Sequence, residues 1–389
     1  MRERTHMKFA RLVGISALGA IAILIAFRGQ AVASDAASCA SADGFVLSFC
    51  MNVPTSTVRH ETTVPLVTLP SQRADVRVEA TVAGPDALAI ALGVDRSVER
   101  LETLFGRPFT ARPRVLVFAS MSSFSVGARE LFGYSAETAD RVANTYGGIF
   151  DRPTATIAVN WSASGTQRMN AAIAHELTHL MVREAAGAQD IPAWLDEGLA
   201  TLVEQDSAGP SIATADEQLS GRAVATTGAI TLAQLESVAD FHKAYARLDR
   251  PLYAYAAYAT RQVGERIGWQ GILAVLAATK TGETFADAYT IASNETIPAL
   301  SRRISADTTA VIVATSGVDA SGNVRWSLFA GTPGKAVQIS ITGAMGYSLT
   351  FTATTDSLGM YRGSFGSTAA AGIYTVRAAG TSATFSTAR

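Results

Sequence analysis

The chain has 389 residues, of which 48% are hydrophobic, and 32 Lys and Arg against 33 Asp and Glu residues give a formal net charge of −1. Such a balance provides no positive field to attract nucleic acid, so nucleic acid is excluded as an expected partner. The length and the apolar content allow two packed domains and a targeting segment.

Residues 1–33 have the features of an export signal. Basic residues precede an uncharged apolar run at 12–27, and small residues at 31–33 resemble a cleavage site, which predicts cleavage after Ala33. The run is short for a membrane-spanning helix, which needs about 20 residues, and an uncleaved membrane anchor is the alternative. In both cases the rest of the chain is expected to be secreted or extracytoplasmic.

Residues 34–79 are rich in Ser, Thr, Ala and Pro and are predicted to form a linker, or at most an ordered hairpin. The only two cysteines, Cys39 and Cys50, lie in this segment. In an oxidising compartment, two nearby thiols most simply form a disulfide that closes a small loop.

The first globular domain is expected to begin near Ala80. Apolar residues at helical spacing predict a helix at 85–105, and a short helix is predicted at 122–133. Runs rich in β-branched and other apolar residues predict strands at 114–119 and 155–161. A mixed α+β domain follows from this order of elements.

The segment HELTH, from His175 to His179, has the most chemical content. On a helix, residues four apart project from one face about one turn apart, so the two histidines can share one metal ion. Imidazole nitrogens suit Zn²⁺. Glu176 would lie beside the metal, where its carboxylate can take a proton from a water on the metal. Buried core histidines are the alternative, but five histidines in this chain would give the pattern by chance roughly once in several hundred such sequences.

A catalytic zinc site needs a third protein ligand and one position for water. The extended pattern with a third histidine would need Gly and His where Val182 and Ala185 stand, so that class is excluded. Glu184 would point about 140° away from the metal face of the same helix. Glu197 lies on a second predicted helix that Pro192 can start, and it is the favoured third ligand.

Asp196 is the rival of Glu197 for this role. It points about 100° away from Glu197 on the predicted helix. We expect Asp196 to be an outer-sphere or an exposed charge.

HELTH followed by WLDEGLATLVE resembles the motif of the gluzincin zinc metallopeptidases, the thermolysin-like and aminopeptidase-like clan. The resemblance implies zinc ligation by His175, His179 and Glu197, with Glu176 as the general base. It also implies that Glu204 orients a ligand histidine, although a solvent-facing glutamate is an equal alternative. The chain has no GAMEN-type segment, so aminopeptidase specificity is not implied. The likeness is nearer to small bacterial peptidase-MA-like domains and covers the middle of the chain, at the matching positions His175, Glu176, His179, Trp194, Leu195, Glu197, Gly198 and Ala200.

The same resemblance implies a substrate-binding edge strand and an oxyanion donor. In gluzincins a strand before the HExxH helix forms the sheet edge above the zinc, which assigns that role to 155–161, with a plain core strand as the alternative. A tyrosine or histidine from a later helix often hydrogen-bonds the oxyanion. Tyr253 and Tyr255 are favoured for this over Tyr258 and His242, and packing is the alternative for each tyrosine.

The segment 206–227 is small and polar and is predicted to be a loop at the rim of the cleft. A short helix is predicted at 231–241 and a stronger helix at 251–268, followed by a helical pair through about residue 292.

From about residue 305 charges become sparse, and seven short alternating runs separated by turn sequences predict a small β-sandwich. It resembles the immunoglobulin-like modules appended to bacterial exported enzymes, and no metal or nucleophile pattern occurs in it. A cell-surface or glycan contact is the expected kind of partner. Trp326, Tyr361 and Tyr374 are the candidates for a glycan-binding face, with core packing as the alternative for each.

These patterns predict an α+β protein with a thermolysin-like, gluzincin metallopeptidase domain at 80–304 and a small all-β immunoglobulin-like sandwich at 305–389. The expected activity is Zn²⁺-dependent hydrolysis of peptide bonds in a peptide or protein substrate. The alternative is a non-catalytic surface or adhesion protein that uses a peptidase-like fold to bind a partner.

Overall fold

The computed structural model describes residues 62–387, except 164, 188, 190, 210–211, 315–322 and 367–370. The predicted export signal and the predicted disulfide between Cys39 and Cys50 lie outside the described residues. Within the described part, no helix combines the length and the apolar character that crossing a membrane requires.

The N-terminal part of the described chain contains a five-stranded mixed sheet in the order β1-β2-β3-β5-β4. β2, β3 and β5 are parallel, whereas β1 and β4 pair antiparallel with their neighbours. The strands predicted at 114–119 and 155–161 are confirmed. The sheet starts before the expected domain boundary at Ala80, because the two first strands precede it. The strands are β1 (Leu66–Thr68), β2 (Asp75–Glu79), β3 (Arg114–Phe118), β4 (Gly148–Asp151) and β5 (Thr156–Asn160).

The edge of the sheet nearest the HELTH helix is β4, so the expectation that 155–161 forms this edge is wrong. β5 lies between β3 and β4, and all five of its residues are buried, as an internal strand requires. β4 has only four residues, GIFD, which is too short a run to show an alternating pattern.

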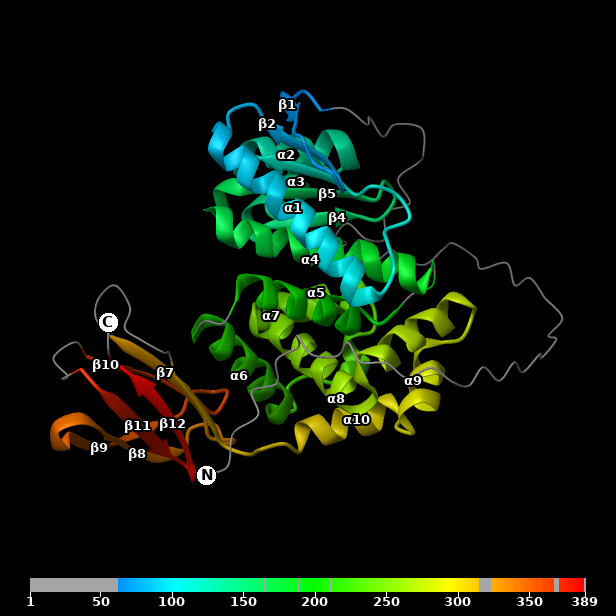
Figure 1. The fold of residues 1–389 in the computed structure, drawn as a ribbon. Coiled ribbons are helices and arrows are strands. Elements are labelled where there is room, and N and C mark those ends of the chain that lie inside the picture. The colour runs from blue at the N-terminus through cyan, green and yellow to red at the C-terminus, as the bar shows by residue number, and fades with distance from the viewer. Residues whose placement is uncertain are drawn as a thin grey trace. The chain divides into compact units, whose positions relative to one another are not determined.

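Helices cover both faces of this sheet, with α1 and α4 on one face and α2 and α3 on the other (Figure 1). Successive side chains of β3 point to opposite faces of the sheet, so β3 packs against both layers of helices. Val115 and Val117 join the core that contains α1 and α4, whereas Leu116 and Phe118 join the core that contains α2 and α3. The helices are α1 (Gly84–Phe105), α2 (Met121–Phe132), α3 (Ala136–Thr145) and α4 (Gly165–Ala186).

Six α-helices follow among the described residues, and α8 is kinked at Gly268, where φ is 70° and ψ is 170°. The expected rim loop at 206–227 is mostly a helix, α6, so this prediction is wrong. Gly221 brings α6 close to α8, because a Cβ there would lie 2.0 Å from the backbone oxygen of Ala254. The Ala, Glu, Gln, Leu and Arg residues of this segment favour a helix, and its Ser, Gly and Thr residues are tolerated in it. The helices are α5 (Ala193–Ala208), α6 (Ile212–Thr227), α7 (Val238–Leu248), α8 (Pro251–Lys280), α9 (Phe285–Ser293) and α10 (Ile297–Ser305).

The C-terminal part forms separate all-β sheets, which we call the C-terminal module, and this confirms a mixed α+β protein with a β-only end. The two antiparallel sheets have the orders β10-β7-β6 and β12-β11-β8-β9. Trp326 and Tyr374 are buried in the core between other apolar residues, so neither offers a glycan-binding surface, and Tyr361 is partly buried. The strands are β6 (Val311–Ala314), β7 (Val324–Phe329), β8 (Ala336–Thr342), β9 (Ser348–Thr354), β10 (Met360–Phe365), β11 (Ile373–Ala378) and β12 (Thr381–Ser386).

Candidate metal centre

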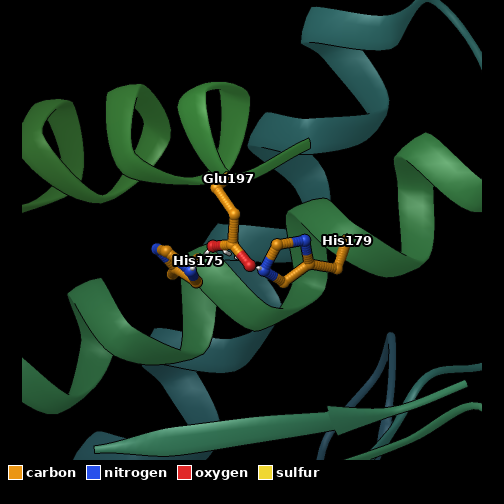
Figure 2. A group of neighbouring side chains, drawn as sticks. All are labelled: His175, His179 and Glu197. Carbon is orange, nitrogen blue, oxygen red and sulfur yellow. Dashed lines mark ion pairs between the residues drawn. The ribbon is translucent and has the colours of Figure 1, made fainter. Parts of the chain in front are cut away.

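The side chains of His175, His179 and Glu197 meet between α4 and α5 (Figure 2). The two histidines lie on α4, and the glutamate reaches them from α5. The glycine after Glu197 fixes how deeply α5 packs, because a Cβ on Gly198 would lie 2.4 Å from the backbone oxygen of Ala256 in α8. The WLDEG sequence therefore supplies both the carboxylate and the close helix contact that positions it.

The distances within this cluster match those of a metal site. Glu197 Oε2 lies 3.5 Å from His175 Nε2 and 3.6 Å from His179 Nε2. Tetrahedral ligands that are each 2.0–2.2 Å from a zinc ion are separated from one another by about 3.3–3.6 Å. One ligand atom from each residue lies within 4.8 Å of the other two. These three residues could therefore hold a metal ion.

The second nitrogen of each imidazole lies beside a carboxylate. His175 Nδ1 is hydrogen-bonded to Glu204 Oε2 at 3.0 Å, and His179 Nδ1 lies 2.9 Å from Asp196 Oδ1. A hydrogen on each Nδ1 leaves the lone pair of each Nε2 directed at Glu197, which is the arrangement of metal-ligating histidines. Of the alternatives from the sequence, Glu204 is therefore a histidine partner, and Asp196 is a buried outer-sphere group.

The cluster is electrostatically prepared for a cation. Burial lowers the pKa of His175, but the carboxylates of Glu197 and Glu204 outweigh it and raise that pKa well above its usual value. Burial also lowers the pKa of His179, and Asp196 and Glu197 outweigh it in the same way. Buried carboxylates of this kind require a compensating positive charge, either protons on the imidazoles or a bound metal ion.

Glu176 is buried next to the two histidines, with 8% of its surface exposed. Burial raises the pKa of Glu176 to about 6, although His175 and His179 act in the opposite direction. Its carboxylate lies against β4, where a Cβ on Gly148 would be 3.0 Å from Glu176 Oε1. A carboxylate with this pKa can accept and release a proton near neutral pH.

Of the two favoured tyrosines, only Tyr253 is brought to the cluster. The centres of its ring and of the His175 ring are 6.2 Å apart, and burial followed by the charge of Glu197 raises its pKa well above the usual value. Tyr255 is fully buried on another side of α8, where burial raises its pKa and Ser301 of α10 opposes this effect. The Tyr255 hydroxyl therefore belongs to the contact between α8 and α10.

The remaining candidates have other contacts. Tyr258 donates a hydrogen bond to Asp307 Oδ2 at 3.0 Å, which is a structural contact at the end of α10. His242 Nδ1 lies 3.1 Å from the hydroxyl of Tyr146, and the ring of Tyr146 stacks on Tyr245. No local pattern in the sequence marks Tyr146, which precedes β4 and reaches His242 of α7 only through the fold.

Searches of protein-family models and of curated proteins found no match to this chain. The metal centre therefore rests on its own geometry, and the gluzincin resemblance of its motif remains a prediction. The described residues establish a mixed α+β protein with a buried His175, His179 and Glu197 group that could hold a metal ion.

Proposed function

We propose that this protein is an exported zinc metallopeptidase with a thermolysin-like, gluzincin domain and an immunoglobulin-like C-terminal module. The observation that carries the proposal is the convergence of two imidazole nitrogens and one carboxylate oxygen, with a buried glutamate beside them. The spacing of the HExxH pattern and of Glu197 supports the same assignment. Export is inferred from the sequence of residues 1–33.

Zinc is the metal that this donor set favours. Two imidazoles and one carboxylate are a known ligand set of catalytic zinc, which keeps its fourth position for water or substrate. When bound, zinc would supply a Lewis acid that polarises a carbonyl oxygen and acidifies a water molecule.

Glu176 is proposed to move the proton during hydrolysis. Its carboxylate takes a proton from the attacking water, whose oxygen forms the new bond to the carbonyl carbon. The same group then delivers this proton to the amide nitrogen as the carbon–nitrogen bond breaks. Burial raises the pKa of the Glu176 carboxyl toward neutrality, which favours a group that both accepts and releases a proton.

Tyr253 and β4 are proposed to hold the substrate. The Tyr253 hydroxyl is protonated at neutral pH, as is any tyrosine whose pKa is ordinary or raised, so it can donate to the carbonyl oxygen as negative charge develops there. Among the described strands, β4 pairs with β5 alone, and its other side can pair with an extended peptide. An unfolded or extended polypeptide is therefore the proposed substrate class.

The test pairs metal content with cleavage of a mixed peptide library. The mature chain is compared with Glu176→Gln and with the matched control Glu283→Gln, which changes an exposed glutamate in the turn between α8 and α9. We expect stoichiometric zinc in all three proteins, with cleavage by the wild type and the control only. Zinc in all three without any cleavage would contradict the peptidase proposal and favour a partner-binding protein.

A further inference from the structure

Helix α6 contacts both the metal-site helices and the C-terminal module. All described residues belong to one compact unit, residues 44–389, and within it α6 packs against α8 and also against β6 and β7. Two adjacent acidic residues of α6 have partners in different regions: Asp216 binds the C-terminal module, and Glu217 binds α5. α6 is therefore placed to transmit a restraint from one region to the other.

On the module side, side chains from two strands bind the carboxylate of Asp216. Nε of Arg362, on β10, lies 2.9 Å from both carboxylate oxygens of Asp216, and the hydroxyl of Ser327, on β7, donates to Asp216 Oδ1 at 2.6 Å. A half-exposed ion pair alone contributes little. Here it borders an apolar contact between α6 and the module, whose four side chains are almost completely buried: Leu219, Ala223, Phe329 and Met360.

On the metal side, α6 holds the side chain of Gln205 at both ends. Gln205 Nε2 donates to Glu217 Oε2 at 3.1 Å, and Gln218 Nε2 donates to Gln205 Oε1 at 3.3 Å. Gln205 is buried and directly follows Glu204, the residue whose carboxylate holds Nδ1 of His175. The last turns of α5 are thus fixed by α6.

We propose, on the basis of the metal site proposed above, that the C-terminal module is a positioning element of that site. Arg362 fixes α6 through Asp216, and α6 fixes Gln205 and with it the neighbouring Glu204. Glu204 then holds His175 in the ring orientation that directs Nε2 at Glu197. Arg362 and Asp216 are therefore positioning residues, and the module acts on metal affinity without contributing a ligand.

The test uses the full chain and two readouts, the zinc dissociation constant from chelator competition and hydrogen exchange of the α5 backbone. The variant Arg362→Ala is compared with the matched control Arg377→Ala, which changes an exposed arginine of the same module on β11. We expect Arg362→Ala to weaken zinc binding by about threefold to tenfold and to speed exchange at residues 203–208. The control should change neither readout.

Asp216→Asn breaks the same ion pair from α6 and leaves the module sequence intact, so unfolding of the module cannot explain its effect. The double variant should bind zinc no more weakly than either single variant, because both changes remove the same ion pair. Unchanged exchange in α5 with both single variants would overturn the proposal. Faster exchange in a protein that binds no zinc would instead support the coupling and contradict the zinc site, since exchange is measured without metal.

Discussion

The C-terminal module and the α4–α5 region bury different kinds of side chain. The module buries Trp326, Tyr374 and aliphatic residues, and its described buried polar residues are serine and threonine. The α4–α5 region buries Glu176, His179 and Asp196, which are 8%, 8% and 6% exposed. A core of the first kind stabilises the fold through apolar burial, whereas buried ionisable groups destabilise it unless they are paired or bind a metal.

This difference separates the origin of stability from the origin of function. The module needs no ion to satisfy its interior, and its strands follow from sequence alternation alone. The helices around the metal centre hold buried carboxylates whose charge is balanced by protons on the imidazoles or by a bound metal ion. Metal removal and substitutions at the metal centre should therefore affect the α4–α5 region and leave the core of the C-terminal module unchanged.

Metal removal should have the largest effect, and it should act on the α4–α5 region. A metal that binds only the folded protein stabilises it by about 4 kcal/mol at a concentration a thousandfold above its dissociation constant. We expect chelation to speed hydrogen exchange in α4 and α5 and to leave the core strands β8 and β11 unchanged. An equal loss of protection from exchange in α4 and α5 and in β8 and β11 would show that the metal does not act specifically on the region with the buried charges.

Tyr253→Phe should give the next largest effect, and Tyr255→Phe is its matched control. Both changes remove one hydroxyl from α8, but only Tyr253 lies beside His175. Loss of a donor to a developing oxyanion should lower kcat by about 100-fold, with zinc affinity unchanged. Steady-state kinetics check this, and an equal loss in the control would assign the effect to packing instead.

Asp196→Asn should have the third largest effect, because it changes one buried carboxylate beside a histidine. Replacing the carboxylate 2.9 Å from His179 Nδ1 removes its charge and leaves its shape. We expect zinc binding to weaken by about tenfold. Asp287→Asn, an exposed position on α9, serves as the control. Unchanged zinc affinity in Asp196→Asn would show that this aspartate does not orient the ligand.

Gly148→Ala should have the smallest effect. The added Cβ would lie 3.0 Å from the Glu176 carboxylate, so Glu176 must shift by a few tenths of an ångström. We expect kcat to fall by about threefold to tenfold with normal zinc content. Gly84→Ala, where an added Cβ meets nothing within 4 Å, is the control. Full activity of Gly148→Ala would show that Glu176 tolerates displacement.

Local patterns predicted the elements and residues whose positions depend on helical or strand periodicity. The four-residue spacing of His175 and His179 and the helix that carries Glu197 are of this kind, as are the strands of the module. The rotation of Asp196 away from Glu197 was also correct, and it brings Asp196 to the second nitrogen of His179 rather than into solvent.

The features that the sequence could not show depend on contacts between distant segments. Gly221 lets α6 pack closely on α8, and this contact between two helices is not visible in the small and polar sequence of the segment. β4 is the edge of the sheet although its own sequence is too short to mark it. Tyr146 and Tyr253 approach the site from segments more than a hundred residues apart. In the sequence, nothing distinguishes a tyrosine that reaches the site from one that only packs in the core.

The most direct test of the metal centre is a crystal structure of the zinc-loaded protein with anomalous scattering measured at the zinc absorption edge. We predict one anomalous peak about 2.0–2.2 Å from His175 Nε2, His179 Nε2 and a Glu197 carboxylate oxygen. A peak bound by other residues, or no peak between α4 and α5 at saturating zinc, would contradict the assignment of this cluster as the zinc site.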